Sequence, residues 1–209
     1  MIRAYHAIFT TYGFWLPNDP RGSWSDSVGS WELFRFGPAT KTDTRRSLAA
    51  APHDQALRQA AKQSLKYPPV CFDGHQALSV ARGFAMAIAE ADYRIFACSI
   101  LPEHVHLVVA RCDRPVERIV THLKAKATAQ LNLDGRHPLA GFASRRRDTP
   151  TPWAENCWKC FLSTDEDIAR AIRYVEENPA KEGKRPQRWS FVVPWETESG
   201  ARMLGSFPF

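Results

Sequence analysis

The chain has 209 residues, of which 44% are hydrophobic and 24% charged, and its formal net charge at pH 7 is +6. This composition is ordinary for a globular protein and argues against a disordered chain. The basic excess favours a polyanionic partner, although many basic proteins bind no nucleic acid. No window approaches the roughly 18 apolar residues of a membrane span, and no signal peptide is recognisable, so we expect a cytoplasmic protein without membrane contact.

The first third of the chain predicts one strand followed by an insertion. Residues 3–12 are aromatic, β-branched and mostly apolar, which is typical of a strand. The stretch from about residue 20 to 75 is rich in proline and has little periodicity, yet we expect it to be ordered, with a short helix around residues 54–66. Its aromatic side chains either form a small core or stack on unpaired bases: Trp24, Trp31, Phe34 and Phe36.

Helices and strands alternate through the rest of the chain. Residues 76–92 carry apolar side chains at helical spacing, and residues 93–102 are typical of a second strand. Pro102 and Glu103 indicate a tight connection into a third strand at residues 104–110.

A helix is predicted next, over residues 116–132, and Pro115 suits its start. Residues 135–152 are polar and predict a loop. A fourth strand within residues 153–162 and a final helix over residues 163–179 complete the set.

The order of these elements predicts an α+β fold. It is compatible with a ferredoxin-like βαββαβ core, which has an antiparallel sheet, with one added C-terminal helix that carries a tyrosine. We therefore expect a single domain over residues 1–209, with a long insertion after the first strand at about 20–75 and an irregular tail at about 180–209.

Two histidines lie on the third predicted strand. Because side chains alternate along a strand, His104 and His106 share one face, about 7 Å apart, which is close enough for both to reach one cation. The opposite face is apolar and predicted to be buried: Val105, Leu107 and Val109. Alone, the pair also fits ordinary surface or core histidines. A histidine-triad hydrolase would need a third histidine where Val108 stands, and a zinc hydrolase would need further ligands that the sequence does not single out.

The final helix carries a tyrosine and an asparagine on one flank. Ser163 with Glu166 has the spacing of a capping box, and Pro179 predicts that the helix ends at about Asn178. Tyr174 lies one turn before Asn178, beside the apolar stripe of the helix. The stripe comprises Ile168, Ala171, Ile172 and Val175. By themselves these residues fit a half-buried tyrosine and a helix-terminating asparagine.

Taken together, "LPEHVHLVV" and "IRYVEENPAKEGK", about seventy residues apart, resemble the single-tyrosine HUH transposases, in particular the REP-associated tyrosine transposases. His104, Val105 and His106 match the family's pair of histidines around a hydrophobic residue. Tyr174 and Asn178 match its tyrosine helix. The segment "YHAIFTTYG" is also similar to the family's first strand, and "FLSTDEDIARAI" to the approach to its tyrosine helix. The long insertion departs from the compact family pattern.

The resemblance implies a transposase or endonuclease that cleaves and rejoins single-stranded DNA, with hairpin-forming targets. It implies Tyr174 as the nucleophile, through a 5′-phosphotyrosine intermediate, and His104, His106 and Asn178 as ligands of Mg²⁺ or Mn²⁺. Two alternatives stay open: a catalytically silent protein that binds DNA hairpins, and a metal-dependent phosphoesterase that uses water. Whether a homodimer exchanges the tyrosine helix also stays open.

Several further residues are candidates for minor roles. Basic side chains that could contact DNA, or equally form a solvated basic surface, are Lys124, Lys126, Arg145, Arg146, Arg147, Arg173, Lys181, Lys184 and Arg185. Cys157 and Cys160 have the spacing of half a zinc site, but no second pair follows, so two buried thiols are favoured. His6, on the first strand, could support the histidine pair or be purely structural.

Overall fold

The computed structural model describes residues 1–44, 48–143, 149–196 and, for the backbone alone, 202–203. Its centre is an antiparallel sheet with the strand order β2–β3–β1–β4. The strands are β1 (Ala4–Thr10), β2 (Ile95–Ile100), β3 (His104–Ala110) and β4 (Trp158–Leu162). β3 lies between β1 and β2, so the predicted histidine strand is a central strand of the sheet.

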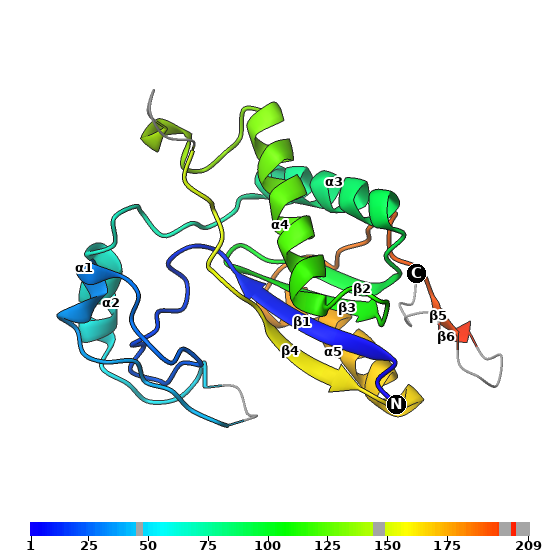
Figure 1. Cartoon of the computed structure of the whole chain (residues 1–209), viewed down its shortest axis with the longest axis horizontal. Coiled ribbons are helices and arrows are strands. Elements are labelled where there is room, and N and C mark those ends of the chain that lie inside the picture. The colour runs from blue at the N-terminus through cyan, green and yellow to red at the C-terminus, as the bar shows by residue number, and fades with distance from the viewer. Residues whose placement is uncertain (45–47, 144–148, 197–201, 204–209) are drawn as a thin grey trace.

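Helices cover both faces of the sheet (Figure 1). α3 (Gly74–Ala91) and α4 (Val116–Leu133) pack on one face, and α5 (Asp165–Lys181) packs on the other. The chain order β1–α3–β2–β3–α4–β4 and the strand order are those of the predicted βαββαβ arrangement, and α5 is the predicted added helix. The α+β fold class is thereby confirmed.

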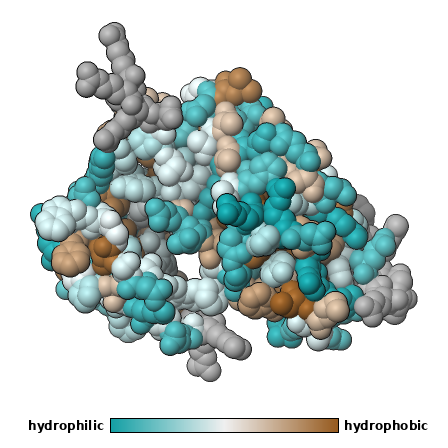
Figure 2. Space-filling model, viewed as in Figure 1, coloured by the Kyte–Doolittle hydropathy of each residue, from teal (hydrophilic) through white to brown (hydrophobic). Residues whose placement is uncertain are grey.

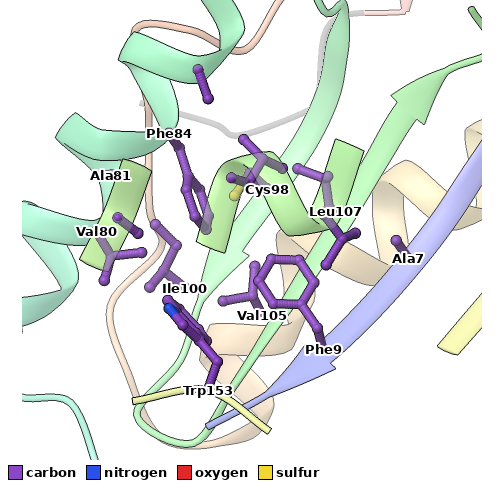
Figure 3. Packing of buried hydrophobic residues seen from close by; sticks show 14 of the residues in the cluster. Ala7, Phe9, Val80, Ala81, Phe84, Cys98, Ile100, Val105, Leu107 and Trp153 are labelled. Carbon is purple, nitrogen blue, oxygen red and sulfur yellow. The ribbon is translucent and has the colours of Figure 1, made fainter. Parts of the chain in front are cut away.

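The larger core lies between the sheet and the pair α3 and α4. Phe84 of α3 stacks on Trp153, and Phe9 of β1 contacts both rings (Figure 3). Val105 and Leu107 point into this core and are fully buried, as the alternation of β3 predicts. The histidines of β3 must then face α5, because successive side chains of a strand point to opposite faces.

The smaller core lies under α5. It combines the apolar stripe of the helix with side chains from all four strands: Ile168, Ala171, Ile172 and Val175 with Ala4, Phe96, Ala97, Val108 and Leu162. This packing fixes which flank of α5 meets the sheet.

Both ends of α5 differ from the prediction. The N-cap is Thr164, whose side chain accepts a hydrogen bond from the backbone N–H of Asp167, and not Ser163. The helix also continues through Pro179 to Lys181, because a proline in the last turn removes only one backbone donor. Gly183 follows the C-cap residue Glu182 and has a φ of 67°, the left-handed conformation that glycine adopts freely after a helix.

The insertion after β1 is ordered and has its own small core (Figure 1). It contains α1 (Trp31–Phe34) and α2 (Gln55–Gln63), the latter within the predicted helical range and capped by Asp54. The core consists of Leu16, Leu33 and Ala61, with Val28, Phe36 and Leu65 against them. Of the predicted aromatic core residues, Trp31 and Phe34 are instead exposed, by 86% and 63%.

The tail covers the edge of the sheet. The side chain of Gln187 pairs with both backbone groups of Ile100, and Val193 donates its backbone N–H to Ile95. The edge strand β2 is thus shielded from pairing with other chains. A 3₁₀ turn, η1 (Ala140–Phe142), and two short paired strands, β5 (Trp195–Glu196) and β6 (Arg202–Met203), complete the elements. No helix in the described ranges is both long and apolar enough to cross a membrane.

We expect Gly83→Ala to destabilise the fold by about 3 kcal/mol, since overpacking at a rigid contact costs this much. A Cβ on Gly83 of α3 would lie 2.5 Å from the Cα of Ala127 in α4, and neither backbone can yield. Gly74→Ala is the matched control, because its Cβ would meet nothing within 4 Å. Urea unfolding of both variants measures the difference. Equal stability of the two would show that α3 and α4 are not in close contact here.

Candidate active site

The two histidines of β3 lie side by side on the α5 face of the sheet. The ring centroids of His104 and His106 are 4.9 Å apart, and the rings are nearly perpendicular. His106 is buried, with 4% of its surface exposed, and the side chain of His104 is 14% exposed. The pair is thus largely shielded from water, with two imidazoles turned toward the same helix.

α5 places the predicted tyrosine against His106, with the predicted asparagine one turn later on the same helix. The ring centroid of Tyr174 is 5.4 Å from that of His106, in an edge-to-face arrangement. Tyr174 is 42% exposed, so the ring rests on the histidine but also borders solvent. Asn178, one helical turn later, is buried, with 7% exposed. The residues that lie seventy positions apart in the sequence therefore meet in the fold.

A third histidine joins this group. His6 of β1 approaches His106, with 3.1 Å between His6 Nε2 and His106 Nδ1, so one nitrogen donates a hydrogen bond and the other accepts it. The His6 ring also lies edge-to-face against Tyr174, at 5.7 Å between centroids. In the β1–β3 register, His6 is diagonal to His106 on the same face, because it is opposite Val108.

Burial keeps the three imidazoles neutral at pH 7. It lowers the pKa of His6 and of His104 to about 4. It lowers the pKa of His106 to about 2, and the repulsion that a charge on His104 or His6 would exert adds to that effect. Neutral imidazoles are the form that can donate a lone pair to a metal ion.

The last turn of α5 adds charged residues to the site. Glu182 Oε1 lies 3.5 Å from His104 Nε2, and burial raises the pKa of this carboxyl group. Lys181 Nζ is 4.9 Å from the centroid of the Tyr174 ring, and it also pairs with Glu177. Both residues reach the site only because the helix continues past Pro179.

Two buried polar side-chain atoms of the predicted ligands lack hydrogen-bond partners within the described ranges, which fits a site that binds a metal ion. His104 Nδ1 and Asn178 Nδ2 are buried and have no hydrogen-bond partner among the described residues. The side-chain amide of Asn178 can be rotated by 180°, which places its oxygen where Nδ2 lies. In the described part of the chain, no three His, Cys, Asp or Glu side chains form a metal-binding group. Of the predicted ligands His104, His106 and Asn178, only the two histidines belong to these residue types.

The predicted DNA-binding residues are distributed over several surfaces. Lys124 and Lys126 are on α4, across the sheet from the histidines. Lys124 donates to the backbone carbonyls of Ala154 and Asn156, and burial lowers its pKa to about 8, whereas Lys126 pairs with Glu90. The structure does not bring these two lysines to the tyrosine.

The other basic candidates lie on or after α5, or outside the described residues. The exposed members near the end of α5 are Arg173, Lys181, Lys184 and Arg185. Arg145, Arg146 and Arg147 lie outside the described residues. DNA contact by any of these side chains stays a prediction.

The two cysteines near β4 give no sign of a zinc site. Cys157 and Cys160 are free thiols of intermediate exposure, so they are less buried than expected. Cys160 Sγ accepts a hydrogen bond from the indole of Trp158.

We expect the free energy of unfolding to fall by several kcal/mol between pH 7 and pH 4. Unfolded histidines bind protons below pH 6.5, whereas the three buried ones do not until about pH 4 or lower, so acid favours the unfolded state. One unit of pKa difference is worth about 1.4 kcal/mol for each group. Urea unfolding at several pH values measures this slope. His6→Gln removes one contributor and must flatten the slope; an equal slope would contradict the burial of His6.

Comparison with known proteins gave structural similarities alone. No family model and no curated protein sequence matches the chain. Solved structures to which the chain is similar include two transposases. The first is a REP-associated tyrosine transposase bound to a REP hairpin, with 14% identity and a TM-score of 0.47 over 97% of this chain and 93% of that one. The second, a candidate transposase from Deinococcus radiodurans R1, has 12% identity and a TM-score of 0.40 over 85% and 92%.

Identities of 14% and 12% with TM-scores below 0.5 carry no argument about function. At these identities and TM-scores, we rest the function on the residues of this chain.

Proposed function

We propose that the protein is a metal-dependent single-stranded DNA transposase or endonuclease, which cleaves and rejoins DNA through a tyrosine. The observation that carries this proposal is the contact of Tyr174 with His106 and His6, with Asn178 buried one turn away. The sequence resemblance supplies the substrate class, which is single-stranded DNA with hairpin-forming targets.

The proposed nucleophile is the hydroxyl of Tyr174. Its oxygen forms a bond to the scissile phosphorus while the bond from phosphorus to the 3′ oxygen breaks. The phenol loses its proton, the 3′ oxygen gains one, and the 5′ phosphate stays on the tyrosine. Attack by a free 3′-hydroxyl reverses these bonds and rejoins a strand, so the phosphotyrosine conserves the bond energy and no nucleotide cofactor is needed.

A positive charge lies beside the proposed nucleophile. The ammonium group of Lys181 is 4.9 Å from the centroid of the Tyr174 ring. A cation at this place would offset part of the negative charge that develops in the transition state.

In the proposed site, His104, His106 and Asn178 would hold Mg²⁺ or Mn²⁺. Such an ion would act as a Lewis acid that orients the scissile phosphate and neutralises charge in the transition state. His6 has a supporting role, because its hydrogen bond to Nδ1 of His106 fixes the ring and its tautomer.

The test uses a pool of single-stranded oligonucleotides, each with a hairpin flanked by random sequence. The purified protein is incubated with the pool and Mn²⁺ or Mg²⁺, then separated on a denaturing gel. We expect a covalent protein–DNA band and a released strand. Cleavage without that band would favour a phosphoesterase that uses water, and binding without cleavage would favour a silent hairpin-binding protein.

A further inference from the structure

The segment after β1 contacts the candidate site through an aromatic ring. Phe14, just after β1, stacks on His104, with 5.4 Å between ring centroids and 14° between ring planes. Lys62 of α2 lies over the same ring, with its Nζ 5.5 Å from the centroid of Phe14. Two contacts therefore link α2 to a proposed metal ligand.

α2 presents a pair of cations on one face. Arg58 and Lys62 are four residues apart, so their side chains are neighbours on the helix surface. The packing of Ala61 and Leu65 into the small core of the insertion fixes the direction of this face. Arg58 Nε is buried, yet no described residue accepts a hydrogen bond from it.

The charges around this pair leave an excess of positive charge. The ion pairs within the described residues involve neither Arg58 nor Lys62. Asp19 is engaged by Arg21 at 2.7 Å, which leaves Glu103 as the unengaged carboxylate that acts on Lys62.

The burial of Lys62 and the positive charges near it also favour binding of an anion. Burial lowers its pKa, and repulsion from Arg58 and Arg21 lowers it further, although Glu103 and Asp19 act in the opposite sense. An anion bound between the two side chains would relieve this repulsion.

The end of the insertion packs into the larger core through Val70 and Phe72, whereas α1 and α2 contribute to the separate small core. The insertion meets β4 where the rings of Trp24 and Trp158 are in contact, and it meets β3 through Phe14. Figure 2 shows an opening between the insertion and the body that holds the sheet.

We propose that Arg58 and Lys62 bind phosphate groups of the single strand that flanks the scissile phosphate. This proposal rests on the proposed function, and it assigns to the insertion the role of a guide for the flanking strand. Guanidinium and ammonium groups bind phosphate oxygens without reading the bases, so this contact supplies affinity and not sequence preference.

The test measures binding of fluorescent dT40 in the Tyr174→Phe background, which cannot form the covalent link. We expect Arg58→Gln with Lys62→Gln to weaken binding about tenfold at low salt. The slope of log affinity against log salt should also fall by about 1.4, since each phosphate contact on a single strand contributes about 0.7. Arg118→Gln with Arg136→Gln removes the same charge from exposed positions on and after α4, and should change neither quantity.

Charge-preserving variants separate binding from packing. Arg58→Lys with Lys62→Arg should retain the affinity and the salt slope, whereas a purely structural role would not depend on charge. Equal binding by the glutamine pair and the control pair would overturn the inference and leave the proposed function intact. If the Tyr174→Phe parent binds no dT40 at all, both the inference and the proposed function fail.

Discussion

Tyr174→Phe should abolish the covalent protein–DNA adduct and lower strand cleavage by about 10⁴-fold or more, as expected when a nucleophile is removed. The phenyl ring can keep its contacts with His106 and His6, because both are made by the ring. Binding of single-stranded DNA and the melting temperature should therefore remain close to those of the wild type. The measurement is a denaturing gel with a labelled hairpin oligonucleotide selected from the pool.

Tyr67, a tyrosine outside the candidate site, offers a control for this substitution. Tyr67 of the insertion contacts Tyr12 and Phe142, and within the described residues its ring packs against none of the three histidines. Tyr67→Phe should leave the adduct unchanged. Adduct formation by Tyr174→Phe at the wild-type rate would mean that another group attacks the phosphate.

His104→Ala with His106→Ala should abolish saturable binding of Mn²⁺ and reduce cleavage to background. Both side chains of the proposed ligand pair are lost, and the amide of Asn178 alone is a weak ligand. Titration calorimetry with Mn²⁺ measures binding without any DNA. His6→Ala should weaken Mn²⁺ binding by about 10–100-fold, since removal of a partner that orients a ligand has an effect of this size.

His75→Ala is the matched control for the metal titration, because His75 is exposed near the start of α3, across the sheet from the site. It should bind Mn²⁺ as the wild type does. Unchanged Mn²⁺ affinity after loss of both His104 and His106 would contradict the proposed ligand set.

The local patterns of the sequence were sufficient for the strands and helices that form the site. β3 begins and ends where predicted, because a short run of apolar and β-branched residues around the two histidines, bounded by Pro102 and Glu103 at its start, marks a buried strand. The stripe of α5 placed Tyr174 and Asn178 on one flank, which is the flank that meets the histidines.

The contribution of His6 could not be predicted from local patterns. Its contact with His106 depends on the pairing of β1 with β3 and on the register that sets His6 opposite Val108. A shift by one residue would turn His6 toward the other face, and sequence alone does not fix that register.

The last turn of α5 and the insertion were missed for different physical reasons. Pro179 was expected to end the helix, but a proline close to the C-terminus costs little, so Lys181 and Glu182 reach the site. The insertion lacks periodicity because only a few apolar residues hold it together, and its stacking contact between Phe14 and His104 has no sequence signature.

The most direct test of the account is to locate the DNA on the protein. The covalent complex formed by the wild type is digested with nuclease and protease, and the peptides are sequenced by tandem mass spectrometry. We predict a nucleotide linked through its 5′ phosphate to Tyr174, one of five tyrosines in the chain. A nucleotide on any other residue, or DNA cleavage that never produces a linked peptide, would contradict the proposed mechanism.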